Sequence, residues 1–203
     1  MMLIEKELHK IAPKNRYKAI TKKTQIVIGL SLRKDDYHIN RLKHKDYGET
    51  KKWCTYSISR FGDVVEHYAP KFYSDYLGIK EADKQSISIV LENMGALVKT
   101  VDGHYINWLN EVCPVKRVEE KTWLGQRYWE KFSEEQIEST VELCATLCEE
   151  FSIQPNVIDF HYPHKDMLNF KGIVLKSNYF DDSNSINPLF DLTKFSDLLK
   201  LKI

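Results

Sequence analysis

Histidines and cysteines are the side chains in this sequence that could hold a metal ion or act as nucleophiles. His161 and His164 form a His-x-x-His pair, and His67 and His104 lie elsewhere in the chain. Imidazole nitrogens are common zinc ligands, but two residues with this spacing need not converge if their segment is extended or irregular. The helix-borne His-Glu-x-x-His pattern does not occur. We therefore interpret the pair as surface or packing histidines.

The cysteines show no metal-binding spacing, because they contain no Cys-x-x-Cys pair and no zinc-finger arrangement with histidine. Cys144 and Cys148 lie four residues apart, which places them on one face of a helix, where we expect them to pack as small apolar side chains. Cys54 could act as a nucleophile only with a base beside it. The sequence assigns no histidine to that role.

The composition is that of an ordinary globular domain. The 203 residues suit one domain, and 42% hydrophobic with 29% charged residues argue against extensive disorder. A formal net charge of +1 gives no reason to expect nucleic acid or an acidic membrane as a partner. Glu5 and Lys6 interrupt the first apolar residues, and no stretch approaches the ~20 apolar residues of a membrane span. We therefore expect a cytoplasmic protein that binds neither nucleic acid nor membrane.

Apolar runs and turn signals predict one mixed α/β domain. Runs rich in β-branched residues predict buried strands at 25–32, 86–91 and 171–175. Two hairpins are also predicted, with strands at 55–60 and 64–68 in the first and at 96–101 and 104–108 in the second.

Helical patterns occur at residues 2–12, at 36–47 and, most strongly, from Ser133. Ser133-Glu-Glu-Gln136 matches a capping box, in which the serine and glutamine side chains satisfy free amides at the start of a helix. Five residues at helical spacing then predict its buried face: Ile137, Val141, Cys144, Cys148 and Phe151.

The order of these segments resembles the zinc-dependent N-acetylmuramoyl-L-alanine amidases, the family of phage lysozyme-type amidases and peptidoglycan recognition proteins. The resembling segments are 25–28 (first core strand), 56–64 (hairpin), 86–93 (a Ser-Ile-Gly-Ile-Glu-Leu strand), 132–136 (start of the long helix), and 170–174 and 187–191 (the two sides of the last metal loop). The resemblance spans about residues 24–195 and implies a central mixed β-sheet flanked by helices. It divides the chain into an N-terminal helix and lead-in, 1–23, and an amidase-like domain, 24–203.

Amidases of this family hold zinc with three protein ligands and an open position for water. The metal lowers the pKa of that water and polarises the muramoyl–alanine amide. Carried over to this sequence, the resemblance places Gly29 at the first ligand, Tyr76 at the second and Lys176 at the third. Ser185 falls at a further ligand position in the last loop, and Val90 replaces the strand glutamate.

These residues do not suit zinc. Glycine has no donor atom, an ammonium group repels a divalent cation, and tyrosine and serine stay protonated near neutral pH. We therefore predict a non-catalytic amidase-fold protein with no metal and no other cofactor. Its groove would be rebuilt from the residues at the former zinc site: Gly29, Cys54, Tyr76, Lys176, Ser185 and Asn187.

This groove has two interpretations with equal support from the sequence. In the first, Lys176 attracts a carboxylate of a muramyl peptide and Tyr76 stacks on a sugar. In the second, the residues simply fill the space that the metal left.

Two other functions stay open. One is an active N-acetylmuramoyl-L-alanine amidase that works without metal or with displaced zinc ligands, for which His161, His164 and His67 are the first candidates. The other is a structural or interaction protein of a phage or a defence system, with a protein partner.

Overall fold

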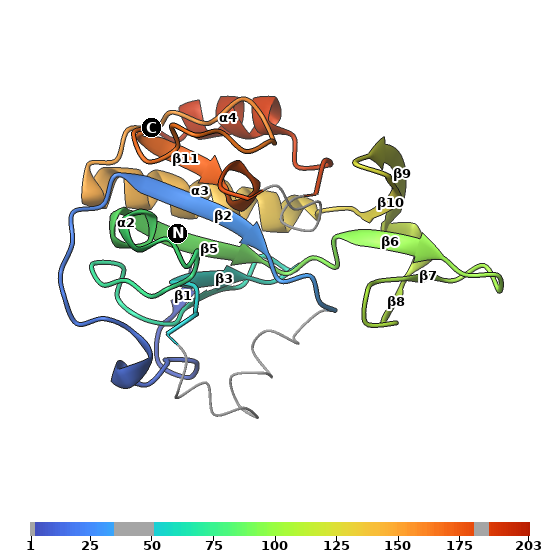
Figure 1. Cartoon of the computed structure of the whole chain (residues 1–203), viewed down its shortest axis with the longest axis horizontal. Coiled ribbons are helices and arrows are strands. Elements are labelled where there is room, and N and C mark those ends of the chain that lie inside the picture. The colour runs from blue at the N-terminus through green and yellow to red at the C-terminus, as the bar shows by residue number, and fades with distance from the viewer. Residues whose placement is uncertain (1–2, 35–50, 181–186) are drawn as a thin grey trace.

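The computed structural model describes residues 3–34, 51–180 and 187–203, which form two β-sheets and three α-helices (Figure 1). The larger sheet has six strands in the order β1-β4-β3-β5-β2-β11. Their bounds are Ile4–Glu5 (β1), Gln25–Leu30 (β2), Tyr56–Ile58 (β3), Val64–Glu66 (β4), Ser86–Leu91 (β5) and Gly172–Leu175 (β11). The sheet is mixed, because β3 and β4 form an antiparallel hairpin while β2 pairs in parallel with β5 and β11. The predicted fold class and central strands are confirmed.

The central strands are short and apolar because both faces of the sheet are covered. All of β5 and nearly all of β2 are buried. Fully buried runs of this kind, apolar except for Gln25, Ser86 and Ser88, are typical of parallel strands with two covered faces. The register places Gly29 opposite Val90.

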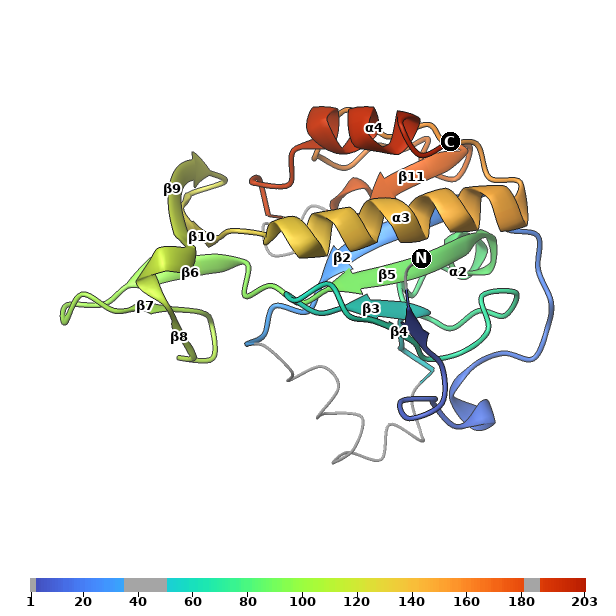
Figure 2. The ribbon, with the colours of Figure 1, turned by 180° about the vertical axis from the view of Figure 1, so that it is seen from behind.

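Helix α3 (Glu134–Phe151) crosses one face of the large sheet (Figure 2). Ser133 caps it as predicted, since its Oγ accepts a hydrogen bond from the Gln136 amide at 3.2 Å. The other half of the predicted capping box is wrong. The Gln136 side chain is fully buried and donates instead to the carbonyls of Ile58 and Glu92, at 3.1 and 3.0 Å, so it ties α3 to the sheet.

The buried face of α3 differs in part from the predicted one. Val141, Cys144 and Cys148 are buried as predicted, but Ile137 and Phe151 are only partly buried. The face turns further toward positions that the pattern did not include, which are Gln136, Thr140, Leu143 and Leu147.

Two shorter helices complete the core. Helix α2 (Lys80–Gln85) leads directly into β5, and α4 (Leu192–Lys200) packs beside α3 (Figures 1 and 2). Short 3-10 turns occur at Pro13–Asn15, Val115–Arg117 and Lys176–Asn178. No helix in the described part of the chain is long and apolar enough to cross a membrane.

A second sheet projects from the core as an arm (Figure 1). Its order is β8-β7-β6-β10-β9, with bounds Ala96–Lys99 (β6), Tyr105–Ile106 (β7), Val112–Cys113 (β8), Val118–Trp123 (β9) and Gln126–Glu130 (β10). The β6–β7 hairpin was predicted, whereas the β9–β10 hairpin was not. Within the arm, the Trp129 side chain of β10 is fully buried and its Nε1 donates to the Lys121 carbonyl of β9 at 2.7 Å.

The predicted helix at residues 2–12 is wrong. This segment contributes the edge strand β1, parallel to β4, and the Ile11 amide donates to the His67 carbonyl at 3.0 Å. Leu3 and Leu8, which would have formed an apolar helix face, are exposed. The edge of β4 supplies backbone hydrogen-bond partners to this segment, and this pairing is more stable than a short helix that lacks packing. The division of the chain at residue 23 stays a prediction, and the predicted helix at 36–47 lies outside the described residues.

Candidate functional site

Three residues at the predicted zinc-ligand positions meet in the structure. Gly29 lies near the end of β2, Lys176 follows β11, and Tyr76 lies in the segment before α2. Because β2 and β11 run in parallel, with Ile28 opposite Leu175, their ends reach the same edge of the sheet. A Cβ placed on Gly29 would lie 2.1 Å from the Tyr76 hydroxyl oxygen and 3.3 Å from Lys176 Cδ. The Tyr76 hydroxyl therefore fills the space that a side chain at position 29 would need.

The Tyr76 hydroxyl is enclosed by apolar groups. Tyr76 packs against a buried cluster that includes Trp53, Cys54, Tyr68 and Val90. Its oxygen is buried and has no hydrogen-bond partner among the described residues. This burial raises the pKa of Tyr76 well above its ordinary value, and the nearby Cys54 adds to the shift. The phenolate that a metal would require is therefore strongly disfavoured.

Lys176 and Cys54 complete the immediate surroundings. The ammonium nitrogen of Lys176 lies 5.1 Å from the centre of the Tyr76 ring, within cation–π distance. Cys54 is 1% exposed, and burial raises the pKa of its thiol well above the usual range, an effect that Lys176 only partly opposes. A thiol that stays protonated is a poor nucleophile and a poor zinc ligand.

Asn187 has a structural role next to this cluster. Its Nδ2 donates to Asn93 Oδ1 at 3.0 Å and to the Glu130 carbonyl at 2.5 Å, while its Oδ1 accepts from the Leu189 amide at 3.0 Å. A cavity of about 10 Å³ separates Asn187 from Gly29, which is at the lower limit for one water molecule. Ser185 lies outside the described residues.

This donor set does not fit zinc. The three residues offer a glycine without a side-chain donor atom, a protonated phenol and an ammonium group. None of these groups is a zinc ligand near neutral pH. Across residues 3–34, 51–180 and 187–203, no three His, Cys, Asp or Glu side chains are grouped so that they could hold a metal ion.

The histidines considered as replacement ligands lie apart from this cluster in different surroundings. His67 is fully buried, with Nε2 2.9 Å from Ser57 Oγ and Nδ1 3.1 Å from the His9 carbonyl oxygen. Burial lowers the pKa of His67 to about 4, so the ring is neutral. His161 is half-buried and its ring lies edge-on to Trp123, whereas His164 and His104 are exposed. These environments agree with packing and surface roles.

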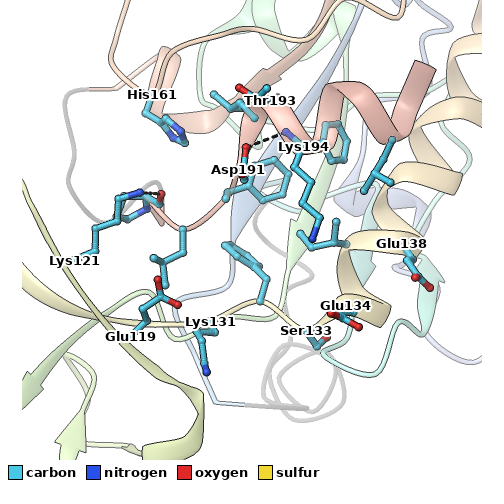
Figure 3. Close-up of a pocket in the computed structure, with 18 of the residues that line it drawn as sticks. Glu119, Lys121, Lys131, Ser133, Glu134, Glu138, His161, Asp191, Thr193 and Lys194 are labelled. Carbon is cyan, nitrogen blue, oxygen red and sulfur yellow. Dashed lines mark hydrogen bonds between the residues drawn. The ribbon is translucent and has the colours of Figure 1, made fainter. Parts of the chain in front are cut away.

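The sequence did not reveal a second, larger cavity in the described part of the structure. A cavity of about 910 Å³ lies between α3, α4 and the arm, and Phe132 and Phe190 are among its lining residues. Its polar rim includes His161, Asp191 and Lys194 (Figure 3). Two of its walls are α4 and β9, and neither element was predicted. The consecutive charged residues Glu119, Glu120 and Lys121 indicate only that this segment is exposed.

Comparisons with known proteins agree on one family. A sequence profile described as N-acetylmuramoyl-L-alanine amidase matches residues 20–172. A search of curated proteins gives no significant match.

Several solved amidase structures share the fold. The chain is similar to the amidase LysC from Clostridium intestinale, with a TM-score of 0.57, 10% identity, and 98% of this chain and 99% of that one covered. It is also similar to Staphylococcus aureus AmiA, solved with its ligand, at a TM-score of 0.58 and 10% identity, with 98% and 82% covered. A third match is AmiD from E. coli, solved with anhydro-N-acetylmuramic acid-L-Ala-D-γ-Glu-L-Lys, at a TM-score of 0.56 and 16% identity, with 93% and 60% covered.

Proposed function

The chain belongs to the N-acetylmuramoyl-L-alanine amidase family, and we propose that it is a non-catalytic member whose zinc position is filled by its own side chains. The observation that carries this proposal is the Tyr76 hydroxyl, which occupies the side-chain space above Gly29. A member that used zinc here would need a ligand side chain at position 29 and room for a metal and a water molecule. Tyr76 and Lys176 take up that room.

We further propose that the protein binds muramyl peptides at Lys176 without cleaving them. The E. coli relative AmiD was solved with a muramyl tripeptide, which carries carboxylates on its peptide. Lys176 is partly exposed and held over the Tyr76 ring, so it presents a positioned cation at the same edge of the sheet. A fixed ammonium group attracts a peptide carboxylate, and this contact needs no metal.

The other functions have less support. An active amidase with displaced ligands would need histidines that converge, but His67 is enclosed in the core and His164 lies on the surface. Among the residues that the structure describes, no contact or cavity specifically favours a phage or defence-system role with a protein partner. The cytoplasmic location and the lack of nucleic-acid binding stay predictions from the sequence.

Catalysis is tested by incubating the purified protein with muramyl dipeptide and with peptidoglycan fragments, and by measuring released peptide by mass spectrometry. We expect no release, with or without added zinc, while a zinc amidase of the family run in parallel releases peptide. Peptide release that a chelator abolishes would contradict the proposal.

Binding is tested separately by isothermal titration calorimetry with muramyl dipeptide. Lys176→Glu should weaken binding about ten-fold, which corresponds to the loss of one favourable charged contact. Lys171→Glu is the matched control, because it makes the same charge change at an exposed position just before β11. Equal effects of the two variants, or no binding by the wild type, would leave the cluster at Gly29 with a packing role only.

A further inference from the structure

A basic cavity of about 520 Å³ lies between the β3–β4 turn, the 3-10 turn before β9 and the start of α3. Its walls carry four cationic side chains, Arg60, Lys116, Arg117 and Lys131, and one carboxylate, Glu135. The aromatic rings of Phe61 and Phe132 also line it. None of these residues belongs to the cluster of Gly29, Tyr76 and Lys176.

The two arginines of this cavity are held in place by a carboxylate beneath them. Glu130 is fully buried, and its Oε1 lies 3.1 Å from Arg60 Nη1 and 3.6 Å from Arg117 Nη1. Arg60 also donates to the Lys131 carbonyl at 2.5 Å, and the Lys131 amide donates to the Arg117 carbonyl at 2.7 Å. Three separate segments of the chain are thus tied together so that their cations face one space.

The turn between β3 and β4 closes the cavity against α3. Gly62 has φ +85°, and a Cβ there would lie 2.9 Å from the Glu135 carbonyl oxygen, so the turn approaches the helix closely. Ser133 Oγ donates to the Arg60 carbonyl and so fixes the cap of α3 to the same turn. The amino end of this 18-residue helix adds partial positive charge on the same side as the cations.

The shape and the charge of the cavity indicate an organic anion. The volume lies in the range of small-molecule sites, about 300–1,000 Å³, and is much larger than a lone inorganic ion requires. Glu130 beneath the arginines and Glu135 in the wall set two carboxylates against the four cations, and the remaining excess of two positive charges favours a dianion over a single carboxylate. Phe61 is 67% exposed at the rim, where its ring is available to pack against the uncharged part of a ligand.

We propose that this cavity binds a small organic molecule that carries a phosphate group. The Lys116 and Lys131 ammonium groups contact the phosphate oxygens, the two guanidinium groups supply the positive field behind them, and Phe61 contacts the organic part. This site is independent of the proposed function at Lys176.

The test is a titration of the ¹⁵N-labelled protein with inorganic phosphate, at an ionic strength held constant with chloride and followed by two-dimensional NMR. We expect saturable amide shifts that are largest at residues 61–62, 116–117 and 131–136. The double variant Lys116→Gln/Lys131→Gln should bind phosphate about ten-fold more weakly, since two of the charged contacts are lost. Lys131→Arg should retain binding, because it keeps the charge.

Lys200→Gln is the control, because it removes one exposed cation on α4, away from the cavity. Shifts that do not saturate, shifts spread over many surface lysines, or an equal loss in the control would overturn the proposal. Acetate run in parallel separates the two kinds of oxyanion. Acetate binding as tight as phosphate binding would overturn the assignment to a phosphate.

Discussion

Replacing Gly29 by alanine should reveal whether the Tyr76 hydroxyl fills the side-chain space at position 29, the predicted place of the first zinc ligand. The new methyl carbon would lie 2.1 Å from the Tyr76 oxygen, where a normal contact needs more than 3 Å, so the two groups must separate by roughly 1 Å. The Tyr76 ring cannot move freely, because it packs against the buried cluster around Cys54 and Val90. Overpacking of this kind should lower the free energy of unfolding by about 1–3 kcal/mol.

Tyr76→Phe removes the oxygen that causes the clash. The nearest remaining atoms to the new methyl group belong to Lys176, at 3.3 and 3.4 Å, and a flexible side chain can give way by a few tenths of an ångström. Tyr76→Phe alone should change stability by less than about 1 kcal/mol, because it deletes a buried hydroxyl that has no partner in the described structure. The double variant should then recover about 1–2 kcal/mol of the cost of Gly29→Ala.

The assay is urea denaturation of the wild type, both single variants and the double variant, followed by circular dichroism. The m-values must agree between variants, so that differences in midpoint report stability alone. A coupling energy below about 0.5 kcal/mol, within the range expected for independent sites, would refute this reasoning. The hydroxyl would then not lie against Gly29.

Three further predictions concern the core. Leu143→Ala, at a fully buried position of α3, should lower the free energy of unfolding by about 2–5 kcal/mol in urea denaturation. Phe151→Ala should lower it by less, because that ring is partly exposed. The reverse order would contradict the assigned buried face. Gln136→Ala should cost about 1–3 kcal/mol, because it removes two buried hydrogen bonds, to the Glu92 carbonyl and to the Ile58 carbonyl, of which the second still accepts from the Glu92 amide. Glu138→Ala on the exposed face should stay within about 0.5 kcal/mol. Burial lowers the pKa of His67 from 6.5 to about 4, so the neutral ring contributes its full stabilisation above pH 6.5. The free energy of unfolding should fall by roughly 3 kcal/mol as the pH drops from 6.5 to 4, because protonation then favours the unfolded chain. A His67→Gln variant with the same pH dependence would contradict this.

The sequence predicted those elements whose local pattern agrees with their tertiary surroundings. The strands β2, β5 and β11 are rich in apolar and β-branched residues because they are buried on both faces. Their local sequence therefore identifies them as strands even when their neighbours are not known. The start of α3 was predicted from the Ser133 cap, which is a local hydrogen bond. Residues 2–12 are the exception. Their amphipathic spacing predicts a helix, but in the folded chain they pair with the edge strand β4, a partner that the local sequence does not reveal.

The sequence predicted that three of the candidate site residues lie together, but not how they pack. The resemblance placed Gly29, Tyr76 and Lys176 together, and parallel strands do bring the first and the last to one edge. The contact between the Tyr76 hydroxyl and Gly29 depends on how the segment before α2 folds over the sheet, which no local pattern encodes. The role of Asn187 was missed for a similar reason, because its partners, Asn93 and Glu130, come from distant parts of the chain.

The most direct measurement is the zinc content of the purified protein, by elemental analysis and by calorimetric titration with zinc. The account predicts substoichiometric metal and no saturable zinc binding at micromolar concentrations, because the cluster at Gly29 offers no deprotonated donor. The variant Gly29→His/Tyr76→His/Lys176→His, which returns imidazole to all three positions and removes the Tyr76 hydroxyl, should gain saturable zinc binding if it folds. One tightly held zinc per wild-type chain, lost on replacement of Tyr76 or Lys176, would contradict the account.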